Sequence, residues 1–136
     1  MTKRDKIVAA ARGWLGTRWH HQGRLKGVGV DCAGLIVCVG KELGLTSFDT
    51  TGYGHRPDSR ELEEICHTNM KAIAIAKARA GDVLLIEVDK MPQHLAFKTD
   101  IGMIHAFAPL RRVVEHRIDE DWQARVVAAF KMPGVR

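Results

Sequence analysis

The spacing of apolar and polar residues predicts helices in the first half of the chain and strands in the second. A first helix is predicted from about residue 3 to near Gly16, because apolar residues recur at helical spacing at Ile7, Ala10, Ala11, Trp14 and Leu15. A second is predicted over residues 32–43, between the N-cap Asp31 and the stop at Gly44. Residues 16–30, which hold four glycines, are predicted to form a loop.

The later elements are predicted in the same way. Asp58, with Glu61 three residues on, is the capping-box pattern of a third helix, whose apolar face is Leu62, Ile65, Cys66 and Met70. Residues 71–80 are ambiguous, with a strand as one option over residues 72–75. Stretches of β-type pattern, separated by turn residues, then predict strands at 83–88, 93–98, 102–107, 112–118 and 125–130. Short connections favour antiparallel neighbours, so an α+β fold is expected, with the second helix packed on one sheet face.

Composition limits the domain organisation and the partners. With 136 residues, 46% of them hydrophobic, the chain is predicted to form a single domain over residues 1–136. The net charge of +5 points to an anionic partner. Nucleic acid is the weaker candidate, because the chain has neither a long Lys/Arg block nor an aromatic-rich basic motif.

The first residues predict neither a signal peptide nor a membrane span. The N-terminus is charged, and the apolar stretch at residues 7–11 is interrupted by Arg12. We therefore expect synthesis in the cytoplasm without a signal peptide.

One of the three cysteines stands out by its position. An odd number without C-x-x-C spacing argues against a disulfide framework and a paired zinc knuckle, and Cys38 and Cys66 are predicted to pack as buried apolar groups. Cys32 falls in the first helical turn, where backbone N–H groups and the helix dipole favour a nucleophilic thiolate. Asp31 opposes this effect by its charge, so a basic partner is required.

Two histidines on predicted strands, His94 and His105, are the candidate partners. A hairpin with a two-residue turn at Thr99-Asp100 would place them directly opposite each other on one face. One imidazole would then accept the thiol proton and the other would orient it. A bulge at Gly102 would shift this pairing, and a one-residue slip would separate the histidines onto opposite faces.

Around these residues the chain resembles the NlpC/P60 family of cell-wall cysteine peptidases, most closely its phage-associated tail branch. The resemblance rests on Gly27-Val28-Gly29-Val30-Asp31-Cys32-Ala33-Gly34-Leu35 and on residues 16–23, 53–58, 81–85, 92–97, 103–107 and 130–133. It implies a papain-like fold with N-terminal helices packed on an antiparallel sheet. It also implies Cys32 as nucleophile, His94 as base and His105 as orienting residue, without a cofactor or metal. The implied reaction is cleavage of peptidoglycan stem peptides, commonly after γ-D-glutamate.

The chain departs from the family pattern in its substrate-binding residues. Many members have Ser after the nucleophile and Tyr shortly before it, whereas this chain has Ala33 and, at the best match for the Tyr, Trp19. An indole can stack and donate a hydrogen bond but does not supply a phenolic hydroxyl. The candidate substrate-binding residues are Trp19, Asp31, His20 and Arg18. Tyr53 and His55 either border the site or fold their loop down.

Two other functions remain open from the sequence. Cys32, His94 and His105 could bind zinc in a non-enzymatic module, although no fourth ligand is evident. The chain could also be a structural subunit of a phage tail, in which case there is no chemical reason to keep all three residues. An enzyme of this kind would reach the cell wall through a phage particle, lysis or a partner, so phage tail proteins are candidate partners beside the peptidoglycan peptide.

Overall fold

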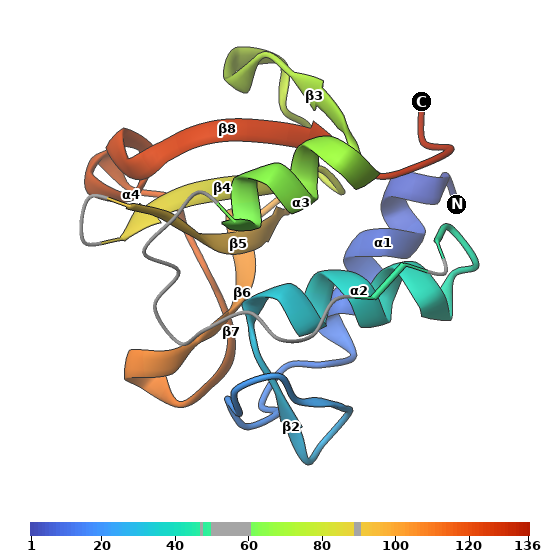
Figure 1. Ribbon diagram of the computed structural model, residues 1–136, viewed down its shortest axis with the longest axis vertical. Helices are drawn as coiled ribbons and strands as arrows, with labels where there is room; N and C mark the ends of the chain where they lie inside the picture. Colours follow the sequence, from blue (N-terminus) through green and yellow to red (C-terminus); the bar gives the residue numbers. More distant parts are fainter. Residues whose placement is uncertain (47, 50–60, 89–90) are drawn as a thin grey trace.

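The computed structural model describes residues 1–46, 48–49, 61–88 and 91–136 (Figure 1). Its helices are α1 (Lys3–Arg12), α2 (Cys32–Glu42), α3 (Glu61–Asn69) and α4 (Glu120–Arg125). A two-stranded hairpin precedes α2 and consists of β1 (Arg24–Leu25) and β2 (Gly29–Val30). The main sheet has six strands, namely β3 (Lys71–Ile73), β4 (Val83–Val88), β5 (Met91–Lys98), β6 (Met103–Phe107), β7 (Arg112–His116) and β8 (Val126–Lys131).

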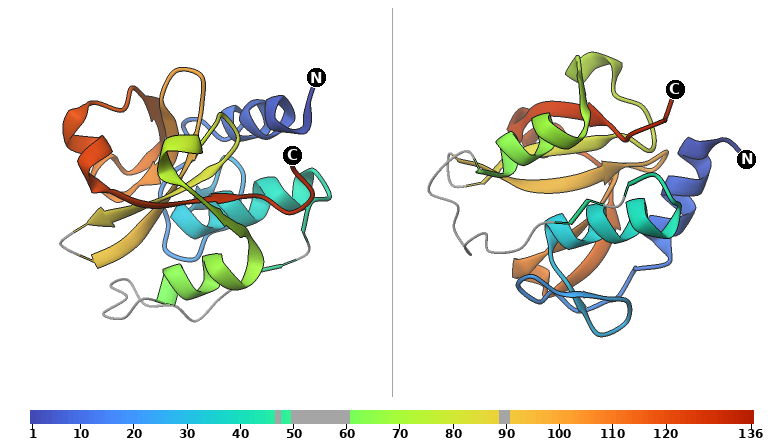
Figure 2. Two further views of the ribbon diagram at one scale, coloured as in Figure 1. Left: turned by 90° about the horizontal axis from the view of Figure 1, so that it is seen from above. Right: turned by 45° about the vertical axis from the view of Figure 1, so that its right-hand side comes forward.

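The main sheet is antiparallel, with the strand order β3-β8-β4-β5-β6-β7. Helices α1, α2 and α3 cover one face, where Ile7, Leu35 and Leu62 share a core with Leu95 and Phe97 of β5 (Figure 2). A smaller apolar cluster lies on the other face, and Trp122 of α4 packs against it. The predicted α+β fold, with N-terminal helices on an antiparallel sheet, is therefore confirmed. Within the described parts of the chain, no helix combines the length and apolar character needed to span a bilayer.

The first helix is shorter than predicted. Thr2 caps α1 by accepting a hydrogen bond from the Asp5 N–H, but the helix ends at Arg12 rather than near Gly16. Gly13 follows as the C-cap, and at Gly16, whose φ is +84°, the backbone N–H donates to the Val113 carbonyl of β7 instead of to a helical carbonyl. A contact distant in sequence therefore ends the helical path.

Several other boundaries differ from the predictions. Residues 71–73 form β3, and Ile75–Lys77 form a 3₁₀ turn rather than a continuation of the strand. The predicted loop 16–30 contains the β1–β2 hairpin, and the unpredicted helix α4 begins after the cap Asp119. The predicted cap Asp58, together with Tyr53 and His55, lies outside the described residues.

The hairpin between β5 and β6 has a different register from the predicted one. Lys98 pairs with Met103 and Phe97 with Ile104, so the turn residues are 100–101 rather than 99–100. Thr99 fixes this choice because its hydroxyl accepts hydrogen bonds from the N–H groups of Ile101 and Gly102 and donates to Glu115. The predicted direct opposition of the two histidines is therefore wrong by two residues. An even shift leaves them on the same face.

Candidate active site

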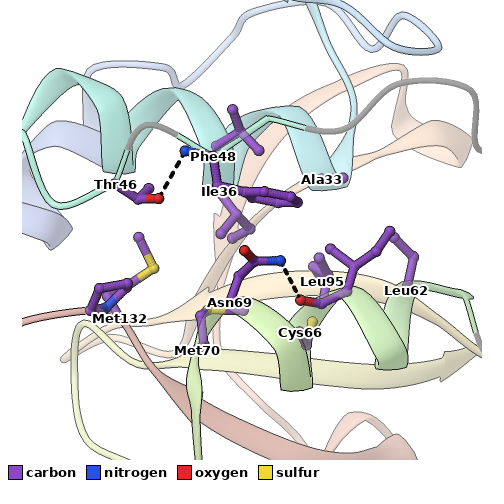
Figure 3. A pocket seen from close by; sticks show the side chains of 13 residues that line it. Ala33, Ile36, Thr46, Phe48, Leu62, Cys66, Asn69, Met70, Leu95 and Met132 are labelled. Carbon is purple, nitrogen blue, oxygen red and sulfur yellow. Dashed lines mark hydrogen bonds between the residues drawn. The ribbon is translucent and has the colours of Figure 1, made fainter.

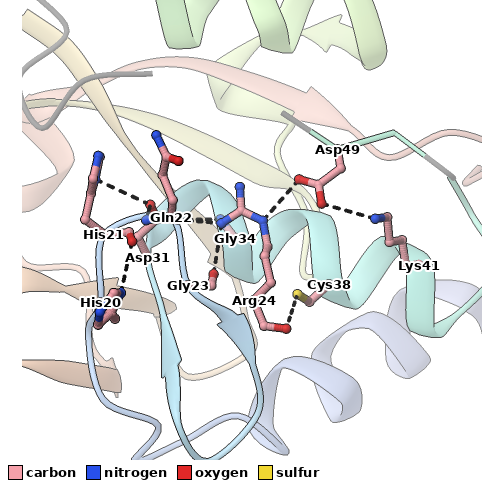
Figure 4. Close-up of polar contacts among 10 residues, drawn as sticks. All are labelled: His20, His21, Gln22, Gly23, Arg24, Asp31, Gly34, Cys38, Lys41 and Asp49. Carbon is pink, nitrogen blue, oxygen red and sulfur yellow. Dashed lines mark hydrogen bonds and ion pairs between the residues drawn. The ribbon is translucent and has the colours of Figure 1, made fainter. Parts of the chain in front are cut away.

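The start of α2 is held in place by the buried carboxylate of Asp31 (Figure 4). Its Oδ1 caps the helix by accepting the Gly34 N–H at 2.8 Å, and its Oδ2 accepts the Gln22 N–H at 2.6 Å. Arg24 donates to the same carboxylate at 3.2 Å and also reaches Asp49. The predicted substrate-binding residue Asp31 thus ties residues 22–24 to the beginning of the Cys32 helix.

Close packing explains the glycine at position 34. A Cβ at this position would lie 2.5 Å from the Gly23 carbonyl oxygen and 2.6 Å from Nη1 of Arg24. Only glycine lets the loop approach the first turn of α2 so closely. The sequence Asp31-Cys32-Ala33-Gly34 therefore supplies the helix cap, the thiol and the space for the loop.

The thiol of Cys32 lies against β5. The residue is half-buried, and the backbone N–H of Leu95 interacts with its sulfur. Burial, followed by the negative charge of Asp31, raises the pKa of Cys32 to about 12, although the N–H groups of Leu95, Ala33 and Cys32 act in the opposite direction. The N–H groups at the helix start therefore act on the thiol in the expected direction, as does the opposing charge of Asp31, but burial has the larger effect and favours the neutral thiol. The loss of water around the sulfur raises the pKa of Cys32 more than the helix terminus lowers it.

His94, which directly precedes Leu95, is in hydrogen-bond contact with His105. The distance between His94 Nε2 and His105 Nδ1 is 2.6 Å, and the ring planes meet at 72°. Burial lowers the pKa of His94 to about 4. The pKa of His105 is lowered to about 2, first by burial and then by its two neighbours, His94 and His116. The two predicted histidines therefore lie in direct contact, and the lowered pKa values favour the neutral form of both rings at neutral pH.

A third histidine, His116 at the end of β7, extends the pair and was missed in the sequence analysis. Its Nε2 lies 2.8 Å from Nε2 of His105, and its Nδ1 lies 2.7 Å from the carbonyl oxygen of Arg117. The indole of Trp122 packs on both His105 and His116, with ring centroids 5.4 and 5.3 Å away. His105 pairs with Val114, so His116 lies two residues along the same face of β7. The alternation of side chains along a strand was the sequence signal that could have identified His116.

The remaining predicted substrate-binding residues lie on the segment before β1. Trp19 is half-buried against the core. Its backbone forms an isolated parallel β-bridge with Val30, two residues before Cys32. Arg18 is exposed, and its backbone forms an isolated antiparallel β-bridge with Arg112 of β7. His20 is also exposed, with Nδ1 3.0 Å from the carbonyl oxygen of His21. The backbones of Arg18 and His20 also hydrogen-bond to Val30, so the fold holds all three residues beside the segment that leads to Cys32.

An apolar pocket opens beside the nucleophile, between α2 and α3 (Figure 3). Ala33 and Leu95, the residues that follow Cys32 and His94, belong to its wall. The other side is formed by Leu62 and Cys66 of α3, and Met132 lies at one end. The neighbours of Cys32 and His94 in the sequence thus line a surface suited to alkyl groups.

The geometry does not form a metal site. The described residues contain no group of three or more His, Cys, Asp or Glu side chains arranged to hold an ion. The facing nitrogens of His94 and His105 are only 2.6 Å apart, whereas two nitrogens bound to one zinc ion each need about 2.0–2.1 Å to the metal and a wider separation from each other. The proposed zinc ligands instead form a direct hydrogen bond.

The arrangement contains the components of nucleophilic catalysis. It holds a thiol at a helix start in contact with Leu95, the imidazole of the preceding residue, His94, and a second imidazole in hydrogen-bond contact with the first. The backbone N–H of Cys32 is one of the first N–H groups of α2, which have no intrahelical acceptor and can stabilise an oxyanion.

Comparison with known proteins places this site in a wider context. A model of the NlpC/P60 family matches residues 16–131. A comparison with curated proteins found no match.

Solved structures with the same fold include the NlpC/p60 domain of the peptidoglycan hydrolase SagA, which is 27% identical with a TM-score of 0.65, over 95% of this chain and 98% of that one. An NlpC/P60 protein from Bacillus cereus has a TM-score of 0.69 at 22% identity, over 95% of this chain and 40% of its own. The peptidoglycan hydrolase RipB from Mycobacterium tuberculosis has a TM-score of 0.67 at 14% identity, over 94% of this chain and 63% of its own. The last two share the fold, and this chain spans only part of their length.

Proposed function

Because the chain belongs to the NlpC/P60 family, we propose that it is a cysteine peptidase that hydrolyses peptidoglycan stem peptides. The observation that carries the proposal is that Cys32 and His105 contact two consecutive residues of β5. The Cys32 sulfur meets the Leu95 N–H, and the preceding residue, His94, is hydrogen-bonded to His105. The similarity to SagA, a peptidoglycan hydrolase, supports the substrate class.

The reaction would proceed through an acyl-enzyme. His94 accepts the thiol proton while the Cys32 sulfur attacks the peptide carbonyl, and the N–H groups at the start of α2 stabilise the oxyanion. His94 then returns the proton to the leaving amine. Water, activated by the same imidazole, hydrolyses the thioester. Since the pKa of Cys32 is raised and that of His94 is lowered, the resting pair is a neutral thiol and a neutral imidazole.

The surroundings of the site support a substrate with carboxylate and alkyl groups. Stem peptides carry free carboxylates, which complement the net charge of +5. The apolar pocket beside Ala33 can accept an alkyl side chain. We propose cleavage after γ-D-glutamate, with Trp19, Arg18, His20 and Asp31 as the residues that shape the substrate groove.

The route to the wall is also part of the proposal. We propose that the protein acts in a phage tail or after release by lysis. Co-purification of the chain with assembled tails of the phage or prophage that encodes it would support the first route, and its absence from them would contradict that route.

Digestion of purified peptidoglycan, with the fragments identified by mass spectrometry, tests the activity. The wild-type protein should release stem fragments with a new amino end, and Cys32→Ala should release none. Cys38→Ala is the matched control, because this second thiol of α2 contacts the Arg24 carbonyl and should be dispensable. Equal fragment release by wild type and Cys32→Ala, or no release by wild type, would contradict the proposal, and the second result would favour a structural tail subunit.

A further inference from the structure

The three histidines form a chain of hydrogen bonds that begins at a backbone carbonyl. The Arg117 oxygen lies 2.7 Å from His116 Nδ1, the two Nε2 atoms of His116 and His105 are 2.8 Å apart, and His105 Nδ1 lies 2.6 Å from His94 Nε2. A carbonyl oxygen only accepts hydrogen bonds, so the first donor in the chain is His116 Nδ1–H.

This starting point determines the position of each following proton. When all three rings are neutral, each carries one N–H, so Nε2 of His116 is bare and accepts from Nε2–H of His105. Nδ1 of His105 is then bare and accepts from Nε2–H of His94. The remaining ring nitrogen of His94, Nδ1, carries no proton. It is the nitrogen not engaged by His105, and in the proposed reaction it is the one left to accept a proton.

We propose that His116 is a positioning residue that, anchored by the Arg117 carbonyl, holds His94 in the tautomer able to accept a proton from Cys32. The inference rests on the proposed peptidase function and extends it by one residue. Reversing the order of donors would place the proton on His94 Nδ1, and the imidazole could no longer act as the base.

The fold keeps His116 at the required place. Gly102, at the end of the β5–β6 turn, contacts this segment so closely that a Cβ would lie 2.6 Å from the Arg117 Cα and would also overlap the His116 carbonyl. Met103 pairs with His116 across the strands. Trp122 packs on the ring from α4, at a centroid distance of 5.3 Å. His116 is therefore held in place by strand pairing, a close backbone contact and an aromatic side chain.

Two substitutions separate acceptor from donor at this position. His116→Gln retains an oxygen that can accept from His105 Nε2–H, so kcat should stay within about tenfold of the wild-type value. His116→Lys can only donate, which reverses the chain, so kcat should fall on the order of 10²–10⁴-fold, the loss typical of a missing general base. KM should change little in both variants. His67→Lys, on the exposed side of α3, is the matched control for the added charge and should keep the wild-type rate.

The tautomer of His94 can also be measured without substrate. Nitrogen-15 NMR of the histidine rings should show a bare Nδ1 and a protonated Nε2 for His94 in the wild type, with the two exchanged in His116→Lys. A protonated His94 Nδ1 in the wild type overturns the inference even if His116→Lys does not fold. Equal loss of kcat in the Gln and Lys variants also overturns it. Wild type with the expected tautomer but no hydrolysis would contradict the proposed function and leave the hydrogen-bond chain in place.

Discussion

Acidification from about pH 7.5 to about pH 5 should destabilise the folded protein by about 4 kcal/mol, because the two buried histidines resist protonation until the chain unfolds. His94 and His105 are 8% and 0% exposed. Burial is the first cause of the lowered pKa of each, to about 4 and about 2. In the unfolded chain both imidazoles regain water and titrate near the ordinary value of about 6.5.

The sign follows from the number of protons bound in each state. Below about pH 6.5 the unfolded chain binds protons that the folded protein excludes, so the free energy of unfolding falls as the pH falls. About pH 5 lies roughly 1.5 pH units below the unfolded value, and each unit corresponds to about 1.4 kcal/mol, which gives about 2 kcal/mol per histidine. The sum is a large part of the roughly 5–15 kcal/mol that stabilises most domains.

This pH range also separates the histidines from the carboxylates. The pKa of Glu115 is lowered chiefly by its hydrogen bond with Arg12, and that of Asp100 likewise by Arg12. The stability from these groups is present above their unfolded values, which are 4.5 and 3.8. It is lost only as the pH falls further, through the lower folded values. Acid destabilisation that is already present at about pH 5 therefore belongs mainly to the imidazoles.

Urea unfolding followed by tryptophan fluorescence, at both pH values and constant ionic strength, measures the effect. His94→Phe should reduce the pH dependence to about 2 kcal/mol, because only one buried imidazole remains. Cys32→Ala is the control and should retain the full difference, because both histidines are kept. An unfolding free energy that is the same at both pH values in the wild type would refute the reasoning, since the rings would then be equally protonated in the folded and unfolded states.

Three further results are expected. His94→Ala should lower kcat on the order of 10²–10⁴-fold in a hydrolysis assay. His105→Gln should retain more activity, because an amide can still orient an imidazole. If His105→Gln proves the more damaging change, the roles of the two histidines are reversed. Labelling of Cys32 by iodoacetamide, followed by peptide mapping, should keep accelerating as the pH rises toward about 12 instead of reaching a plateau near neutrality. Gly102→Ala should cost about 1–3 kcal/mol in urea unfolding and lower kcat by displacing His116; an unchanged free energy would disprove the close contact.

Most of the helices and strands could be predicted because their pattern is local. The apolar periodicity of α2, its cap Asp31 and the apolar runs of β4 and β8 all lie within short stretches of sequence. Helix α4 has only six residues, and its cap Asp119 gave the only local signal. Six residues contain too few turns for a reliable apolar periodicity.

The register of the β5–β6 hairpin depended on contacts distant in sequence. Thr99 selects the turn through its hydroxyl, which donates to Glu115 of β7. Arg12 of α1 in turn holds that carboxylate through two nitrogens, at 3.1 and 2.9 Å. A turn sequence that matches no strong two-residue type leaves the choice to such partners. Local reasoning could therefore place both histidines on strands but could not determine which residues lie opposite them.

The state of the thiol illustrates the same limit. From the sequence, a helix start favours the thiolate of Cys32, and this effect is present in the structure as the N–H groups that lower its pKa. The larger effect is burial, which depends on how α2 is covered by β5 and the rest of the core. Loss of solvent around a charged group exceeds the gain from a few backbone dipoles unless a counter-ion is present.

Burial connects the stability of this site with its chemistry. A protonated imidazole donates at both nitrogens, so a charged His105 would have no acceptor nitrogen for His94 Nε2–H, and the ordered chain from the Arg117 carbonyl would end there. The low pKa of His94 and His105 keeps both rings neutral over the range in which the protein is folded. The same desolvation that makes the fold sensitive to acid therefore gives each hydrogen bond a single direction. A site of solvated histidines would gain acid stability but would lose control over which nitrogen of His94 carries the proton.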